Sequence, residues 1–283
     1  MRVVGLWVLR AVVVALAVGF VYASFIFLTL PDVRVLRTRN PDTTAFIELR
    51  ATQARELGRK PRRLQQWVDY RRIAPSLTRA VTVAEDSAFW QHDGVDLQQI
   101  RESMEINLER MAFARGASTI TQQLAKNLYL SPSRNPVRKL RELLIARRLE
   151  RELSKRRILE LYLNVIEWGD GVYGAEAAAR AYFRKPASGL TPHESALLAA
   201  AIINPRVLDP GHPSARLRRR QQMILRRMGA VTVPPAMGPV SAEAPAPTSD
   251  PGSVPATVGA PLELPGQIVA PSTGREGRPP GSR

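Results

Sequence analysis

The apolar positions at the start of the chain form one unbroken stretch. Residues 11–30 carry no charged side chain. At about 1.5 Å of rise per residue, a helix of this length spans about 30 Å, the thickness of the hydrocarbon core of a bilayer. The apolar region of a cleaved signal peptide is shorter, at about 7–15 residues. We therefore predict an uncleaved transmembrane helix over residues 11–30, preceded by a cytoplasmic N-terminus over residues 1–10.

Similar numbers of arginines flank this stretch on its two sides. Arg2 and Arg10 precede it and favour a cytoplasmic N-terminus, but three more arginines follow it closely, at positions 34, 37 and 39. Long domains cross the membrane largely regardless of such charges. The count of Lys and Arg therefore does not set the orientation by itself.

Through the middle of the chain the apolar positions recur at helical spacing. Leucines follow at intervals of three to five residues behind Asn135 and the proline after it, a pair typical of a helix start. A second such run covers residues 158–165, and Thr191 with Glu194 forms the pattern of a capping box. No strand-like alternation of comparable length occurs. We therefore predict a mainly α-helical domain over residues 76–230.

Two segments differ in composition from this domain. Residues 31–75 are polar and rich in arginine, which predicts a juxtamembrane segment between the anchor and the domain. Residues 231–283 consist largely of Pro, Ala, Gly, Ser and Val with few charges. Such a tail cannot bury enough apolar surface to offset its ordering entropy, and we predict that it is disordered.

The net charge and the missing residue types narrow the possible chemistry. The 283 residues include 41 Lys and Arg against 25 Asp and Glu, a net charge of +16, which suits phosphates and anionic lipid headgroups. The sequence has no cysteine, which excludes disulfides, cysteine-ligated metals and thiol nucleophiles. The three histidines are scattered and form no HExxH pair, so no metal-ligand set is predicted.

A first group of reactive side chains lies between residues 85 and 94. Three carboxylates, two of them adjacent, fall within these ten residues together with two aromatic rings, a histidine and a glycine. Glu85 follows the largely apolar residues 81–84, so its carboxyl is expected near apolar walls, where a raised pKa suits a general base. The alternative is a solvated acidic pair at a helix end, with a histidine that only packs.

Two further groups combine small, amide and cationic side chains. Residues 116–127 open a helix that displays Gln123 and Asn127 four residues apart, with Lys126 beside them. Free backbone N–H groups at such a helix start suit phosphates or sugar hydroxyls. Residues 134–142 bring cations and a carboxylate into about two helical turns, and such a cluster can hold a pyrophosphate. The alternatives are ordinary capping for the first group and solvated i,i+4 pairing for the second.

At these three places together the chain resembles glycosyltransferase family 51, the peptidoglycan glycosyltransferases. The pattern ED-x-x-F-x-x-H-x-G is met at residues 85–94, GASTITQQ-x-x-KN at 116–127 and RK-x-x-E at 138–142. A K-x-x-IL-x-x-YLN element follows at 155–164. Arg184 departs from the pattern, because glycine is usual there. No S-x-x-K or K-T-G motif of a transpeptidase occurs, so the likeness is to the monofunctional biosynthetic peptidoglycan transglycosylases.

The resemblance implies a mainly α, lysozyme-like bilobal fold and a reaction between two lipid-linked sugars. The donor is a glycan chain on undecaprenyl pyrophosphate. The acceptor is lipid II, whose GlcNAc 4-hydroxyl attacks the MurNAc anomeric carbon with inversion. Glu85 is the implied general base, and Glu142 would orient the cations or a divalent metal. No cofactor is required, although Mg or Mn at the pyrophosphate fits the chemistry.

The resemblance also assigns roles to the remaining motif residues. Those expected to bind the donor sugars and phosphates are Ser118, Gln122, Gln123, Lys126, Asn127, Arg134, Arg138 and Lys139. Those expected to support the loop that carries Glu85 are Asp86, Phe89, His92 and Gly94. The set contains no dedicated metal ligand.

By the same resemblance, the protein is anchored once in the bacterial inner (plasma) membrane, with a periplasmic catalytic domain. Its expected partners are lipid II, the lipid-linked glycan, membrane lipids and other cell-wall synthases, and no nucleic acid. One rival interpretation is a catalytically silent, membrane-anchored scaffold of wall synthesis. Another is a basic membrane-anchored protein that binds nucleic acid or anionic lipid by charge alone.

Overall fold

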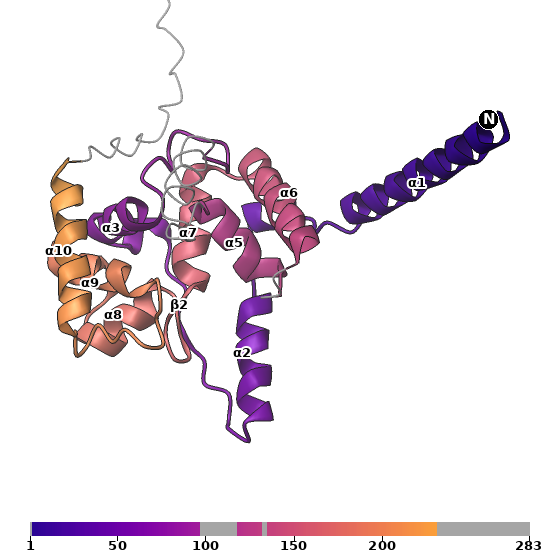
Figure 1. Ribbon diagram of the computed structural model, residues 1–283. Helices are drawn as coiled ribbons and strands as arrows, with labels where there is room; N and C mark the ends of the chain where they lie inside the picture. Colours follow the sequence, from indigo (N-terminus) through magenta and orange to yellow (C-terminus); the bar gives the residue numbers. More distant parts are fainter. Residues whose placement is uncertain (1, 97–117, 132–134, 231–283) are drawn as a thin grey trace, which may run out of the picture. The chain divides into compact units, whose positions relative to one another are not determined.

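The computed structural model describes residues 2–96, 118–131 and 135–230 (Figure 1). The predicted tail at 231–283, Arg134 and the first two residues of the 116–127 motif lie outside the described residues. Within the described ranges the chain is mainly helical, as predicted. The α-helices are α1 (Arg2–Leu28), α2 (Ala45–Glu56), α3 (Pro75–Glu85), α5 (Ile120–Tyr129), α6 (Pro136–Glu152), α7 (Lys155–Val165), α8 (Ala175–Phe183), α9 (Pro192–Ala201) and α10 (Ala215–Ala230). Short 3-10 helices are η1 (Arg34–Arg37), η2 (Tyr70–Arg72) and η3 (Ala187–Gly189).

Helix α1 contains the predicted membrane span. Its residues Leu9–Leu28 form a stretch that is long and apolar enough to cross a membrane, and nearly all of it is exposed. The helix ends at Leu28, two residues before the predicted end. Pro31 disfavours helical backbone angles at the residue before it. The Thr29 hydroxyl also donates to the Phe25 carbonyl at 2.7 Å, which satisfies one of the last carbonyls of the helix.

The helix starts predicted from the sequence are present. Asn135 caps α6, where its Oδ1 accepts the backbone N–H two residues further on at 2.8 Å. Thr191 and Glu194 form the capping box of α9. A second capping box, between Thr119 and Gln122, begins α5. This last cap fixes the start of the helix that carries the GASTITQQ motif.

A small sheet, which was not predicted, connects segments far apart in the chain. Its order is β1-β3-β2, with β1 (Leu64–Gln65) parallel to β3 (Val172–Tyr173) and β2 (Glu167–Gly169) antiparallel to β3. In this register Leu64 lies opposite Val172, and Glu167 lies opposite Tyr173. Strands of two or three residues are too short to show the alternation by which strands are recognised in a sequence.

The hydrophobic core is built around α7. From Ile158 to Val165 every residue except Glu160 is buried. Helix α5 packs against α6 and α7, while α9 packs against both α3 and α10 (Figure 1). This packing brings the end of α3 next to the start of α5, where the Ile120 N–H donates to Asp86 at 2.9 Å.

Residues 31–75 belong to this core, which corrects the prediction of a separate juxtamembrane segment. Leu36, Val68 and Ile73 are all buried in it. The buried Asn164 of α7 ties the segment down, because its Oδ1 accepts the Val68 N–H and its Nδ2 donates to the Val68 carbonyl, both at 2.9 Å. The buried positions are scattered among arginines without a regular period, so the sequence pattern did not indicate that they are buried.

Arg184 ends α8 in the left-handed conformation, with φ at 57°. This conformation costs an L-residue about 1–2 kcal/mol, whereas glycine adopts it freely and loses about 0.5–1 kcal/mol of chain entropy instead. We therefore expect Arg184→Gly to stabilise the protein, raising the Tm by about 2–4 °C. Ala181→Gly, at an exposed position inside the same helix, is the matched control and should lower the Tm. A lower Tm in Arg184→Gly would show that the arginine side chain stabilises the helix end.

Candidate active site

Glu85 is the last residue of α3, and its side chain is only 13% exposed. Its Oε2 accepts a hydrogen bond from Gln123 Nε2 at 3.0 Å. The Tyr162 hydroxyl donates to Oε1 of the same amide at 2.9 Å, which turns the Gln123 NH₂ group toward the glutamate. Because Tyr162 is fully buried, this chain of two hydrogen bonds anchors the carboxylate to the core.

The surroundings of Glu85 change its proton affinity. Burial raises the pKa of Glu85 above that of a free glutamate, and the Gln123 hydrogen bond and the charges of Arg220 and Lys126 only partly oppose this effect. Arg220 of α10 comes within 3.9 Å of Oε1. A carboxylate with raised proton affinity is suited to accept a proton as a general base. The alternative of a solvated acidic pair does not hold, because both Glu85 and the neighbouring Asp86 are shielded from solvent.

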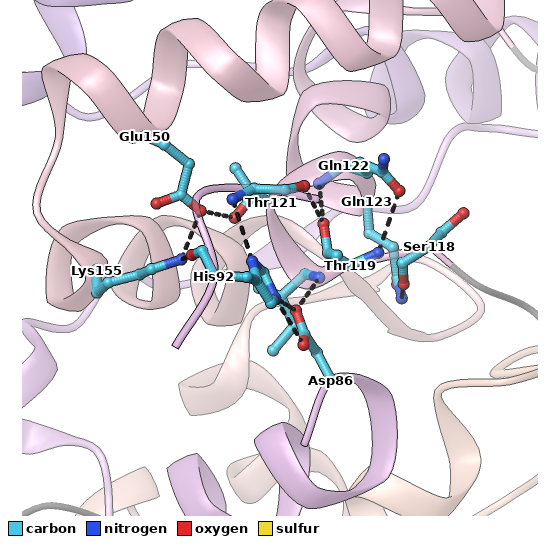
Figure 2. A network of polar contacts seen from close by, with 11 residues as sticks. Asp86, His92, Ser118, Thr119, Thr121, Gln122, Gln123, Glu150 and Lys155 are labelled. Carbon is cyan, nitrogen blue, oxygen red and sulfur yellow. Dashed lines mark hydrogen bonds and ion pairs between the residues drawn. The ribbon is translucent and has the colours of Figure 1, made fainter. Parts of the chain in front are cut away.

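Asp86 joins the end of α3 to the start of α5. It is 1% exposed, and its Oδ2 accepts the Ile120 N–H at 2.9 Å. His92 Nε2 lies 2.9 Å from Oδ1 (Figure 2). The Gly94 N–H donates to His92 Nδ1 at 3.1 Å, so the neutral ring carries its proton on Nε2 and donates to Asp86. This network holds the loop after Glu85 in place.

A further set of contacts surrounds the same loop. Phe89 is fully buried, and the Lys155 ammonium lies 4.7 Å from the centre of its ring. Lys155 also bonds Glu150 at 2.8 Å, and Glu150 accepts the Thr121 hydroxyl at 2.5 Å (Figure 2). Gly94 has φ at 85°, and a Cβ there would lie 2.9 Å from Glu150 Cγ, so only glycine fits. These positions suit support of the loop rather than contact with a substrate.

Glu142 of α6 holds two cations side by side. It is 3% exposed, its Oε2 accepts from Arg138 at 2.7 Å, and its Oε1 bonds Lys139. Lys139 also donates to the Ser118 hydroxyl at 3.1 Å, which links α6 to the residues just before α5. The burial of Glu142 distinguishes this cluster from a solvated i,i+4 pair.

Lys126 lies between Glu85 and the cation cluster that Arg138 and Lys139 form on α6. Its pKa is lowered by burial and by the charges of Arg138 and Lys139, whereas Glu142 and Glu85 act in the opposite direction. The ammonium makes no hydrogen bond to any of the residues that the structure describes. Lys126 thus interacts electrostatically both with Glu85 and with the cations that Glu142 holds.

Gln122 and Asn127, both predicted to bind substrate, make hydrogen bonds within α5 and its capping box. Both are buried, Gln122 at 3% and Asn127 at 8% exposure. Gln122 Oε1 accepts the Thr119 N–H at 3.2 Å within the capping box, and Asn127 Nδ2 donates to the Gln123 carbonyl at 2.8 Å. Both side chains therefore support α5, and their contact with substrate stays a prediction. Arg134, the remaining predicted contact, lies outside the described residues.

Tyr162 and Arg220 contact the site, although the sequence interpretation gave neither a role. Tyr162 stands among apolar residues of α7 and resembles an ordinary core position. Arg220 is one of three consecutive arginines at 218–220. It lies three residues after the buried Leu217 and four before the buried Ile224, so it shares their face of α10. That spacing is the signal that separates Arg220 from its neighbours.

The acidic side chains of the site do not form a cation-binding site of their own. In the part of the chain that the structure describes, no three His, Cys, Asp or Glu side chains come together as metal ligands do. Both oxygens of Glu142 are bonded to cations, and Glu85 Oε2 is bonded to an amide. These oxygens therefore do not fit a divalent cation held by the protein.

Comparison with known proteins identifies the family. A family model described as transglycosylase matches residues 52–229. The chain belongs to the transglycosylase family. The biosynthetic peptidoglycan transglycosylase of Laribacter hongkongensis is 45% identical over 228 residues, which are 81% of this chain and 99% of that protein. The proteins of the same name from Nitrosomonas eutropha and Azoarcus sp. are 45% and 43% identical, over 81% and 83% of this chain and 92% and 100% of their own lengths.

The family match agrees with the fold. The transglycosylase domain is mainly helical and lysozyme-like, as the motif resemblance implied. The match begins at residue 52, inside α2, rather than at the predicted boundary of residue 76. This earlier start accords with the burial of residues from the 31–75 segment in the core.

Proposed function

We propose that this chain polymerises lipid II into β-1,4-linked glycan strands, with Glu85 as the general base. Membership of the family makes it a glycosyltransferase of peptidoglycan synthesis. The observation that carries the finer assignment is the shielded carboxylate of Glu85 beside a cluster of fixed cations. A base next to such cations suits the attack of a hydroxyl on a carbon whose leaving group is an anion.

In this proposal the acceptor 4-hydroxyl gives its proton to Glu85 as its oxygen attacks C1 of the donor MurNAc. The bond between C1 and the pyrophosphate oxygen breaks, and its electron pair stays on the undecaprenyl pyrophosphate. Attack opposite the leaving group inverts the anomeric configuration, as in inverting glycosidases that activate a nucleophile with one carboxylate. Glu85 then returns the proton to solvent.

The cations would stabilise the pyrophosphate as it leaves. Pyrophosphate is a good leaving group, so it requires charge stabilisation more than protonation. Arg138 offers the planar donor group that suits phosphate oxygens, and Lys126 and Lys139 add charge beside it. Glu142 keeps two of these cations at fixed positions. A Mg or Mn ion would be carried by the pyrophosphate oxygens, because those of Glu142 are already bonded.

Gln123 and Ser118 would position the donor between base and cations. Gln123 bonds Glu85 Oε2 at 3.0 Å, and the Ser118 hydroxyl accepts from Lys139 at 3.1 Å. These two polar groups thus connect the base with the cation cluster. Sugar hydroxyls and phosphate oxygens are the ligands that such amide and hydroxyl groups bind.

We further propose that α1 anchors the protein in the bacterial inner membrane, with the catalytic domain in the periplasm. The length and exposure of the apolar stretch Leu9–Leu28 support an anchor. The net charge of +16 suits contact with anionic headgroups of the membrane lipids. A catalytic domain in the periplasm is expected to have other cell-wall synthases as its protein partners. The proposed reaction involves no nucleic acid.

Incubation of the purified full-length protein in detergent with labelled lipid II tests the proposed function. The expected product is a ladder of glycan chains that muramidase degrades. Lipid II that stays unpolymerised while bound to the protein would contradict catalysis and favour the scaffold interpretation. Tight, salt-sensitive binding of nucleic acid without polymerisation would favour the basic binding protein instead.

Replacement of Arg220 by glutamine is expected to move the acid limb of the pH–rate profile to higher pH. The positive charge lowers the pKa of Glu85 against the larger effect of burial. Without it the pKa rises further, and the base is deprotonated only at higher pH. Polymerisation rates measured from about pH 5 to 9 check this shift. Arg219→Gln, at the exposed neighbouring position, is the control, and identical acid limbs in the two variants would contradict the role of Arg220.

A further inference from the structure

A cavity lined mostly by charged residues lies apart from Glu85 and the cation cluster. Its volume is about 320 Å³, and it is lined by α2, by the segment between α2 and β1, and by the turn between β2 and β3. None of its lining residues belongs to the site described above. The volume is at the lower end of the range for small-ligand pockets, about 300–1,000 Å³, and suits one end of a larger molecule.

Glu167 lines this cavity with an unsatisfied carboxylate oxygen. Its side chain is 3% exposed, and Oε2 accepts two hydrogen bonds from Arg50, at 2.9 and 3.2 Å. Oε1 is buried and has no hydrogen-bond partner among the residues that the structure describes. Buried polar atoms nearly always have a partner, so an unpaired oxygen beside a cavity points to a donor that arrives with a ligand.

Some of the cations that line the cavity are already paired with a carboxylate, and others are not. Arg50 is paired with Glu167, and Arg206 with Asp170 at 3.1 Å. Arg59, Lys60 and Arg62 also line the cavity and are exposed.

These three residues, Arg59, Lys60 and Arg62, have no ion-pair partner in the described part of the chain, and Glu56 is the one remaining acidic residue of the lining. The mouth of the cavity therefore has a surplus of positive charge. Such a group of cations attracts carboxylates.

We propose that this cavity binds an acidic peptide that also carries a primary amine, with the amine at Glu167 and carboxylates at Arg59, Lys60 and Arg62. An ammonium group donates a charge-assisted hydrogen bond to the free oxygen, which is stronger than the bond that a neutral hydroxyl would donate. A simple anion such as phosphate would contact the cations at the mouth but would leave this oxygen without a donor. The stem peptide of peptidoglycan combines carboxylates with an amine, and this identification of the source rests on the proposed function.

Calorimetric titration of the full-length protein with a soluble peptide tests the site directly. The probe is the pentapeptide of alanine, D-isoglutamate, lysine and two D-alanines, acetylated at its N-terminus so that the lysine side chain is its single amine. We expect saturable binding that weakens about tenfold or more when this amine is also acetylated. Equal binding of the two peptides, equally tight binding of inorganic phosphate, or no binding would overturn the proposal.

Two variants test the residues. Glu167→Gln keeps the size of the side chain and its contact with Arg50, and should weaken peptide binding about tenfold. The double variant Arg59→Glu/Arg62→Glu changes only exposed positions, where substitutions usually alter stability little, and should also weaken binding about tenfold. Arg226→Glu, exposed on α10 and outside the cavity, is the matched control with unchanged affinity. Wild-type affinity in the double variant would overturn the assignment.

The result can be separated from the proposed function, because peptide binding requires no turnover. Polymerisation of lipid II by a protein that binds no peptide would overturn the cavity assignment alone. Amine-dependent peptide binding by a protein that does not polymerise lipid II would support the cavity and contradict only the catalytic proposal.

Discussion

Replacement of Glu85 by glutamine is expected to reduce the rate of lipid II polymerisation about a thousandfold. Glutamine has nearly the same size and still accepts the Gln123 N–H through its oxygen, but it cannot take a proton from the acceptor hydroxyl. General bases typically contribute about 10²–10⁴ in rate. The raised pKa of Glu85 shows that the fold favours its protonation more than water does. Glycan ladders from the two forms, compared under identical conditions, measure the effect.

The same variant carries a stability signature that distinguishes loss of the base from misfolding. Because burial raises the pKa of Glu85 in the folded state, the folded protein holds this proton to higher pH than the unfolded chain does. Ionised Glu85 is therefore destabilising above the raised pKa, and this effect vanishes below the ordinary pKa of 4.5. We expect the Tm of Glu85→Gln relative to wild type to rise as the pH increases from about 4 to 8.

Asp93→Asn is the matched control for Glu85→Gln. It makes the same change of carboxylate to amide in the same loop, at an exposed position. We expect the Asp93 variant to polymerise lipid II at close to the wild-type rate. A wild-type rate in Glu85→Gln would remove Glu85 as the base, and equal losses in both variants would point to the loop as a whole.

The parts of the site that lie on one helix or one loop were predictable from sequence spacing. Arg138, Lys139 and Glu142 share two turns of α6, and the structure joins them. A helical period shows which face of a helix is buried, but not which other helix covers it. The approach of Arg220 from α10 and the hydrogen bond from Tyr162 of α7 depend on that packing, and neither was predicted.

Burial also separates side chains that look equivalent in the sequence. Gln122 and Gln123 are adjacent in the GASTITQQ motif, and both were predicted to bind substrate. The helix start at Ile120 directs them differently, so that Gln122 closes the capping box while Gln123 reaches Glu85. Similarly, the apolar residues of the 31–75 segment become part of the core only through partners such as Asn164, about a hundred residues away.

Replacement of Glu142 by glutamine is expected to lower the polymerisation rate about a hundredfold, the loss typical when one fixed electrostatic contact to the developing charge is removed. An amide has no charge with which to hold Arg138 and Lys139, and its oxygen can accept from only one of them in place of the two bonds that Glu142 now makes. The cations would then repel each other and turn toward solvent, which the 49% exposure of the Lys139 side chain permits.

A double-mutant cycle shows whether Glu142 acts through the cations that it holds. If Glu142 only positions Arg138, then Arg138→Ala and the combination Arg138→Ala/Glu142→Gln should lose similar activity, because the second change has nothing further to displace. Glu152→Gln is the matched control, since Glu152 lies on the same helix and its partner, Arg37, lies outside the site. Losses that multiply in the double variant would show that Glu142 acts independently of Arg138, through Lys139 or through the substrate itself. A wild-type rate in Glu142→Gln would mean that the cations keep their places without it, and the charge stabilisation of the pyrophosphate would then rest on Lys126 and on contacts that α6 makes by itself.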